Sequence, residues 1–385
     1  MTAFEFATAG RIVYGEGCSR SVPGWAAGFG STSLVVAGED PGRAEWLVEA
    51  LQQQGAEVVL LCVGGEPDIA FVSGGAELAR RRSIQVLVGI GGGSALDAAK
   101  AIAALATNEG DPLDYLEVVG AGKAIANAPL PFIAVPTTAG TGSEVTRNAV
   151  LSVPDRRLKA SLRSPLMLPR IAVVDPLLTY DLPPSITATT GLDALTQLIE
   201  PFLSVRANAM TDALCRDGIG RVARSLERAC RDGHDAAARA DMSLASLFGG
   251  IALANAGLGA VHGLAAPIGG MFNAPHGAVC AALLPHVMAA NLRAMGGHSG
   301  SAETLERADE VGRLLIGSAS ADASAAVDWL LDIVERLRVP RLGEFGVSAA
   351  DLPAVAEQAQ RSSSMKGNPV ALSAPELNAV LAAAL

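Results

Sequence analysis

Short apolar runs alternate with helical segments through the first half of the chain, and this alternation restricts the fold most strongly. The runs SLVVAG (33–38), VVLLCV (58–63) and VLVGI (86–90) are followed by two shorter ones at 132–135 and 171–174. The segments between them carry apolar residues at helical spacing. Uninterrupted apolar strands separated by helices are typical of βαβ units and of a parallel sheet covered on both faces. The pattern predicts an α/β fold for this half.

The pattern changes after the sequence DLPP at 181–184. Strand-like runs disappear, and helical periodicity dominates up to the C-terminus, most clearly near 304–316, 322–338, 349–361 and 374–385. We therefore predict two domains, an α/β domain over 1–182 and an all-helical domain over 183–385.

Charge and composition exclude some classes of protein. The chain carries 29 Lys and Arg against 39 Asp and Glu, a net charge of −10, and its longest basic run is Arg80-Arg81-Arg82. Nucleic-acid binding needs a dense basic surface, so we expect no nucleic-acid partner. The first residues have no basic and apolar leader pattern, which predicts a cytoplasmic protein.

Residues 242–292 contain no Asp, Glu, Lys or Arg. A membrane-spanning helix needs about 20 unbroken apolar residues, whereas Gly, Asn, His and Pro interrupt this stretch repeatedly. We read it as buried helices and expect no membrane contact. It holds His262 and His276.

A glycine-rich turn joins the third apolar run to a helix, in GIGGGSALDAAK at 89–100. Glycines let backbone amides approach a phosphate, and a helix N-terminus attracts negative charge. Tight strand–helix packing would explain the same glycines. A second polar turn, PTTAGTGSEVT at 136–146, also follows an apolar run. Two such turns at one sheet edge indicate a dinucleotide site.

Asp193 and Gln197 are four residues apart in GLDALTQLIE, on one face of a predicted helix. A carboxylate and two imidazoles, from His262 and His276, would make a divalent metal site if they faced one cavity. The spacing does not decide this, because hydrogen-bonded core histidines fit the same sequence. Lys159 could reach a cofactor phosphate or lie on a solvated face.

Taken together, these motifs resemble the iron-containing (group III) alcohol dehydrogenases over nearly the whole chain. The matching segments occur in the family's order: GIGGGSALDAAK, PTTAGTGSEVT, VVDP at 173–176, GLDALTQLIE, HGLAAPIGGMFNAPHG and Asn368-Pro369. The resemblance implies a Rossmann-like N-terminal domain, a helical C-terminal domain, NAD(P), a divalent metal such as Fe²⁺ or Zn²⁺, and a homodimer.

The resemblance also implies roles for individual residues. Asp193, His262 and His276 correspond to metal ligands. The positions that correspond to cofactor-binding residues are Gly92, Gly93, Ser94, Asp97, Thr137, Thr138, Thr146 and Lys159. The implied activity is reversible hydride transfer between the cofactor and a small alcohol or carbonyl compound.

Two positions depart from the family. Gln197 replaces a ligand histidine, and Ala266 replaces a histidine implicated in proton transfer. We expect Gln197 and His262 to be the catalytic residues, with Gln197 either completing the metal shell or donating a hydrogen bond to the substrate oxygen. The departures leave alternatives open: a metal-independent reductase of the maleylacetate type, a dehydroquinate synthase-like lyase, or a nucleotide binder that has lost activity.

The end of the first apolar run bears on cofactor choice. Gly38 leaves room for a 2′-phosphate, whereas the carboxylates of Glu39 and Asp40 would repel one. The sequence predicts NAD, with NADP remaining possible.

Overall fold

The computed structural model describes residues 3–117, 119–156, 158–296 and 302–385. It divides into two compact units. The sheet unit comprises Thr8–Thr138 and Gly142–Tyr180, and the helical unit comprises Asp181–Leu385 with residues 3–7 and Ala139–Thr141.

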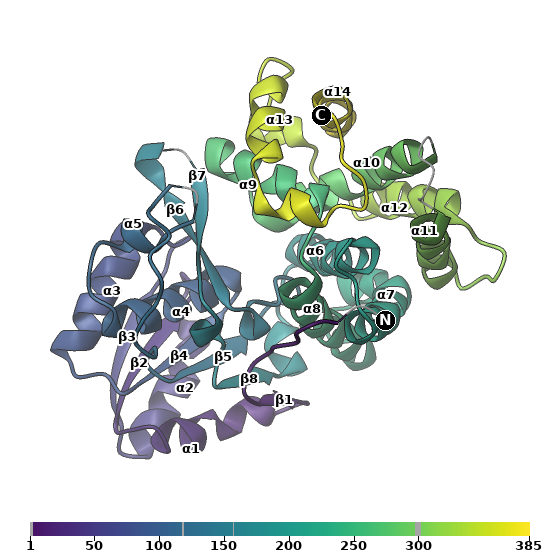
Figure 1. The fold of residues 1–385 in the computed structure, drawn as a ribbon. Helices are drawn as coiled ribbons and strands as arrows, with labels where there is room; N and C mark the ends of the chain where they lie inside the picture. Colours follow the sequence, from purple (N-terminus) through teal and green to yellow (C-terminus); the bar gives the residue numbers. More distant parts are fainter. Residues whose placement is uncertain (1–2, 118, 157, 297–301) are drawn as a thin grey trace. The chain divides into compact units, whose positions relative to one another are not determined.

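The sheet unit contains a parallel sheet whose strand order is β1-β8-β5-β4-β2-β3 among the described residues (Figure 1). These strands are β1 (Ile12–Tyr14), β2 (Thr32–Ala37), β3 (Glu57–Cys62), β4 (Val86–Gly91), β5 (Phe132–Pro136) and β8 (Ile171–Val174). All five apolar runs form strands, so the predicted α/β fold is confirmed. The sequence analysis did not anticipate β1 or the antiparallel pair β6 (Asn148–Val153) and β7 (Leu158–Arg163).

Helices cover both faces of this sheet (Figure 1). Alternate residues of β2 point to opposite faces: Val35 packs with α1 (Val22–Ala27) and α2 (Gly42–Gln53), whereas Leu34 packs with α3 (Ile69–Arg81) and α4 (Gly93–Thr107). Every residue of β4 is buried, as a central strand requires. A short helix, α5, spans Pro112–Tyr115.

The strand order reverses direction beside β2. The chain passes from β2 to β3 on one side, and then returns to β4 on the other side of β2. Ligands of open α/β sheets bind at the carboxyl ends of the strands where the order reverses. The ends of β2 and β4 are therefore the place to look for a cofactor.

The helical unit packs nine α-helices within its described residues (Figure 1). They are α6 (Pro184–Leu203), α7 (Ala209–Arg231), α8 (Ala236–Ala256), α9 (Ala260–Phe272), α10 (His276–Gly296), α11 (Ala302–Ile316), α12 (Ala323–Arg336), α13 (Leu352–Gln360) and α14 (Ala374–Ala384). Pro184 occupies the first turn of α6, where its missing N–H costs no hydrogen bond. Strands are absent from the described part of this unit, and the predicted all-helical character is confirmed.

The helix α10 is long and apolar enough to cross a membrane by length and composition alone, and so is the bent pair of α8 and α9. Of the apolar window in α10, 78% is buried within the described structure. That burial is what a core helix of the unit shows.

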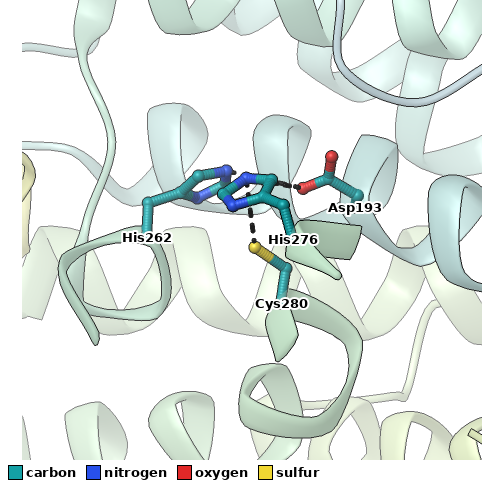
Figure 2. Close-up of side chains that lie close together, drawn as sticks. All are labelled: Asp193, His262, His276 and Cys280. Atoms are coloured by element: carbon teal, nitrogen blue, oxygen red, sulfur yellow. Dashed lines mark hydrogen bonds and ion pairs between the residues drawn. The ribbon is translucent and has the colours of Figure 1, made fainter. Parts of the chain in front are cut away.

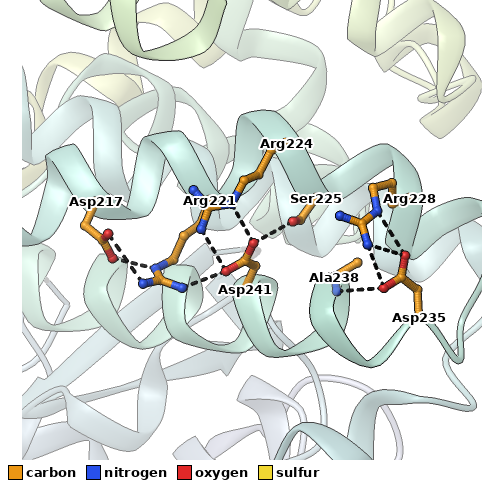
Figure 3. A network of polar contacts seen from close by, with 8 residues as sticks. All are labelled: Asp217, Arg221, Arg224, Ser225, Arg228, Asp235, Ala238 and Asp241. Atoms are coloured by element: carbon orange, nitrogen blue, oxygen red, sulfur yellow. Dashed lines mark hydrogen bonds and ion pairs between the residues drawn. The ribbon is translucent and has the colours of Figure 1, made fainter. Parts of the chain in front are cut away.

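A network of charged side chains joins α7 to α8 on their polar faces (Figure 3). Arg221 contacts Asp217 on its own helix and Asp241 on α8, the latter with an N–O distance of 2.6 Å. Ser225 donates to Asp241, and Arg228 pairs with Asp235 at 2.7 Å. Single exposed ion pairs contribute about 0–1 kcal/mol, so we assign this network to the orientation of two helices rather than to chemistry.

Short 3₁₀ helices complete the secondary structure: η1 (Cys18–Ser21), η2 (Ser143–Val145), η3 (Pro154–Arg156), η4 (Pro165–Met167), η5 (Pro176–Thr179), η6 (Leu342–Phe345) and η7 (Ser363–Gly367).

Candidate functional site

Four potential metal ligands converge inside the helical unit (Figure 2). Asp193 comes from α6, His262 from the first turn of α9, and His276 and Cys280 from the first two turns of α10. One ligand atom of each lies within 4.8 Å of those of the other three. The structure thus brings together the three residues that the sequence singled out as metal ligands, and adds a thiol.

The closest approaches are compatible with donors around one small centre. His262 Nε2 lies 3.5 Å from Asp193 Oδ1, and His276 Nε2 lies 3.8 Å from the same oxygen. Cys280 Sγ lies 3.5 Å from His276 Nε2. His276 and Cys280 are one helical turn apart, so they share one face of α10.

Three atoms at this centre are buried without a hydrogen-bond partner among the described residues. They are Asp193 Oδ1, Gln197 Oε1 and His262 Nε2. The side chains of Asp193 and His262 are only 1% and 7% exposed. An unsatisfied buried polar group costs about 1–3 kcal/mol. Oxygen and imidazole nitrogen are good donors for divalent transition metals, so these residues fit a cation at this centre.

The electrostatics of the cluster favour positive charge. Burial opposes ionisation of Asp193, yet His276 and His262 hold its pKa below the ordinary value. Burial also opposes protonation of His276, but Cys280 and Asp193 outweigh it and raise its pKa to about 9. A divalent cation would compete with protons for the same lone pairs.

Two further side chains orient the ligands. Glu200 Oε2 lies 2.7 Å from His262 Nδ1, and Glu200 Oε1 accepts the Val261 N–H at 2.6 Å. This contact holds a proton on Nδ1, so that Nε2 is the nitrogen that can face a cation beside Asp193. Gln197 Nε2 donates to Asp193 Oδ2 at 3.1 Å. A carboxylate behind a ligand histidine is a recurrent feature of metal sites.

The backbone before α9 allows this arrangement. A Cβ on Gly259 would lie 2.8 Å from Asn368 Oδ1 and 2.9 Å from Glu200 Oε1. Asn368 Oδ1 accepts the Ala260 N–H at 3.0 Å. The close approach of α9 to Glu200 therefore requires glycine at this position.

In the sheet unit, a cavity of about 250 Å³ lies at the point where the strand order reverses. Its lining comes from the ends of β2, β4 and β5, namely Ala37, Gly38, Glu39, Asp40, Arg43, Ile90, Gly91, Gly92, Thr137 and Thr138. Gly92 is the residue before α4, so the positive end of a 15-residue helix meets this cavity. The cavity suits a phosphate-containing ligand.

The predicted cofactor residues fall into two groups. Gly92, Thr137 and Thr138 line the cavity, whereas Gly93 and Ser94 form the first turn of α4 beside it. The other three do not belong to the lining. Asp97 and Thr146 join a network around the buried Lys100, and Lys159 pairs with Glu66 at 2.5 Å. Their binding roles stay predictions.

The sequence analysis missed the roles of Cys280, Glu200 and Lys100. Cys280 had a usable signal, since it follows His276 by four residues on one helix. Lys100 Nζ donates to Ser143 O at 2.8 Å and to Asn148 O at 2.7 Å, holding the second polar turn. Glu200 had no local signal, because its partner His262 lies 62 residues away. Lys100 has one local partner, Asp97, but the oxygens that define its role lie 43–48 residues away.

Comparisons with known proteins agree with the motifs. The model of the iron-containing alcohol dehydrogenase family matches residues 9–176, and the model of its C-terminal domain matches residues 187–385. Alcohol dehydrogenase 4 of Saccharomyces cerevisiae is 39% identical over 316 residues, which cover 82% of this chain and 80% of the yeast protein. Choline dehydrogenase of Bacillus subtilis is 36% identical and covers 85% and 81% of the two chains.

A solved structure of a 1,3-propanediol oxidoreductase superimposes with a TM-score of 0.92, at 32% identity and over 100% of both chains. None of these three relatives is a maleylacetate reductase, so they favour alcohol chemistry over that alternative. The chain belongs to the iron-containing alcohol dehydrogenases, and it is an oxidoreductase that acts on alcohols.

Proposed function

We propose that this oxidoreductase interconverts a small, uncharged alcohol and its aldehyde or ketone with NAD, assisted by a divalent cation at Asp193, His262 and His276. The observation that carries the proposal is a pair of buried ligand atoms, Asp193 Oδ1 and His262 Nε2, which lie 3.5 Å apart and have no hydrogen-bond partner among the described residues. Burial opposes protonation of His262, yet Cys280 and Asp193 raise its pKa well above the ordinary value, so a positive charge is favoured between these two atoms, and a divalent cation would displace the imidazole proton.

The chain's residues would divide the work between holding and orienting. When bound, the cation supplies Lewis-acid stabilisation of negative charge on the substrate oxygen, and NAD supplies or accepts the hydride. Glu200 fixes the ring of His262, and Gln197 fixes the carboxylate of Asp193. Since Ala266 has no ionisable group, we assign proton exchange with the substrate oxygen to water.

Gln197, which the sequence analysis expects to be catalytic, contacts the ligand Asp193. Its amide hydrogen is engaged by Asp193 Oδ2, while its buried Oε1 has no hydrogen-bond partner among the described residues. We therefore propose that Gln197 acts chiefly as a positioning residue for Asp193. A Gln197→Ala variant should then lose metal affinity, and not merely substrate affinity.

The cavity lining supports NAD as the preferred cofactor. Glu39 and Asp40 both line it, beside the single cation Arg43. A surplus of negative charge opposes a 2′-phosphate. We expect kcat/KM to be at least about tenfold higher with NADH than with NADPH, which corresponds to about 1.4 kcal/mol. A preference for NADPH would overturn this choice.

We also propose that the chain acts as a homodimer, as the family resemblance implies, and that it works in the cytoplasm. Mass by light scattering at several protein concentrations tests the first part. Fractionation of the source cells tests the second.

Metal content and turnover test the main proposal together. Wild type, Asp193→Ala and the control Asp181→Ala are purified without oxygen and supplied with Fe²⁺ or Zn²⁺. The Asp181 side chain is 87% exposed and belongs to no cluster of metal ligands among the described residues, so its loss should change nothing. We expect about one metal per chain and aldehyde reduction in both wild type and the control. Asp193→Ala should show neither bound metal nor aldehyde reduction. Turnover by wild-type protein without metal would refute the cation's part.

A further inference from the structure

Cys280 points into the same centre as the three expected metal ligands (Figure 2). Its Sγ lies 3.5 Å from His276 Nε2, and its side chain is fully buried. The neighbouring Asp193 Oδ1 and His262 Nε2 are themselves buried and have no hydrogen-bond partner within the described ranges. The thiol is thus one donor of a convergent set and not an isolated cysteine.

Gln197 leaves the set one strong ligand short. The family resemblance places an imidazole at this position, whereas the Gln197 amide nitrogen donates to Asp193 Oδ2 at 3.1 Å. An amide oxygen is a neutral, weak donor compared with imidazole. Cys280 reaches the centre from α10 and can replace the missing donor.

The three shortest separations between the ligand atoms bear on the coordination geometry. Zinc–nitrogen and zinc–oxygen bonds of about 2.1 Å and a zinc–sulfur bond of about 2.3 Å place tetrahedral neighbours about 3.4–3.6 Å apart. The same bond lengths at right angles would give about 3.0 Å. The observed separations are 3.5, 3.5 and 3.8 Å. These three separations are nearer to the tetrahedral value than to the right-angle value, and all four ligand atoms lie within 4.8 Å of one another.

We propose that Cys280 is a fourth ligand of the cation at Asp193, His262 and His276, and that the resulting oxygen, nitrogen and sulfur set selects Zn²⁺ over Fe²⁺. The inference rests on the proposed cation-assisted function and names the metal of that site. Thiolate is a soft ligand that favours zinc. Coordination replaces the thiol hydrogen with the metal and releases one proton to solvent. Zinc can expand to five ligands during catalysis, so four protein donors still leave room for a substrate.

Cobalt substitution tests the sulfur ligand directly. Co²⁺ is loaded into metal-free wild type, Cys280→Ser, Asp193→Ala and the control Cys230→Ser, and absorption spectra are recorded. Cys230 is half-buried on α7 and belongs to no metal cluster among the residues described, which makes it a matched thiol control. We expect wild type and Cys230→Ser to show a thiolate-to-cobalt charge-transfer band and the visible bands of tetrahedral cobalt.

The variants separate this inference from the proposed function. Cys280→Ser should lose the charge-transfer band but keep bound cobalt, because Asp193, His262 and His276 remain. Retained visible bands also show that this variant is folded. Wild-type protein that binds cobalt without a charge-transfer band overturns the sulfur ligand and leaves the cation-assisted function standing. Wild-type protein that binds no cobalt overturns both.

Metal competition tests the selectivity. Changing residues that only orient a ligand costs about 10–100-fold in metal affinity, so losing a ligand should cost at least about 100-fold for Zn²⁺. We expect the Fe²⁺ affinity of Cys280→Ser to fall by less than about tenfold, because iron has less preference for sulfur. Equal losses for both metals in Cys280→Ser would overturn the claim that the thiol sets the choice of metal.

Discussion

Glu200 offers a test of how the site is held, because it touches a ligand but not the centre itself. Its carboxylate is 6% exposed and bridges His262 Nδ1 and the Val261 N–H at 2.7 and 2.6 Å. The substitution Glu200→Gln keeps the shape of the side chain and leaves one oxygen for two donors. The new amide hydrogens must then face either the imidazole N–H or the backbone N–H.

The magnitude follows from those two bonds. A hydrogen bond to a charged group contributes about 1.5–3 kcal/mol, and a buried donor left unpaired costs about 1–3 kcal/mol. Glu200→Gln loses one such bond and retains the other in a weaker, neutral form. We expect the free energy of unfolding of the metal-free protein to fall by about 2–3 kcal/mol. Because the ring of His262 loses its orientation, zinc affinity should fall by about 10–100-fold.

Urea unfolding and zinc competition against a chromophoric chelator measure the two quantities. The matched control is Glu227→Gln in the same unit, whose carboxylate is 43% exposed and pairs with Arg336. An exposed pair contributes about 0–1 kcal/mol, so this control should keep both stability and zinc affinity. If Glu200→Gln binds zinc within about threefold of wild type, Glu200 does not orient His262 and the reasoning is wrong.

Three further predictions concern the sheet unit. Burial raises the pKa of Glu144 from 4.5 to about 7. The stability that comes from keeping this carboxyl protonated is fully present below pH 4.5 and is lost as the pH rises through 7. In urea unfolding, the free energy of unfolding of Glu144→Gln should match that of wild type near pH 4.5 and exceed it by up to about 3 kcal/mol at pH 8. Lys100→Met leaves its buried oxygen partners and Asp97 without their cation, and should destabilise this unit by about 3–5 kcal/mol in the same assay. Gly91→Ala should weaken NAD binding in calorimetry by at least about tenfold, because φ is +152° and the new Cβ would lie 2.7 Å from Ala95 Cβ.

Each of these has a contradicting result. A difference between Glu144→Gln and wild type that does not change with pH would show that this carboxyl is not the titrating group. A stable Lys100→Met would mean that the polar turn does not depend on the buried ammonium. Wild-type NAD affinity in Gly91→Ala would show that the end of β4 does not approach the cofactor.

The sequence predicts the strands that have continuous apolar runs, including the edge strand β3, in which no residue is buried, and it misses the strands that lack such a run. The runs that became β2, β4 and β5 are continuous and apolar because helices cover both faces of the sheet. By contrast, β1 has three residues and none of them is buried, and β6 alternates buried with less buried positions in a hairpin. Such elements depend on their partners in the fold, which a single local pattern does not specify.

The site shows the same limit at the level of single residues. Asp193, His262 and His276 could be named because family motifs surround them. Glu200 could not, because its role depends on a contact with His262 across 62 residues of chain. The cofactor positions divide similarly: Gly92 is fixed by its place between a strand and a helix, whereas Lys159 turns to Glu66, which no local pattern indicates.

Charge accounting explains why a thiol suits this particular cluster. The stretch 242–292, which supplies both histidines and Cys280, contains no Lys or Arg, so no fixed cation lies near the ligands along it. With neutral imidazoles, Asp193 and a Cys280 thiolate carry two negative charges among the ligands themselves, which a divalent cation cancels, while the Glu200 carboxylate behind His262 adds a third. An imidazole in place of the thiolate would leave the ligand set and the cation with one positive charge, which the Glu200 carboxylate would balance, so the cation would be a stronger Lewis acid but would be held by one charge fewer. The combination of Gln197 and Cys280 therefore lowers the Lewis acidity of the metal and holds the metal more tightly. We expect Cys280→Ser to have a higher kcat per bound metal than wild type and a lower metal affinity.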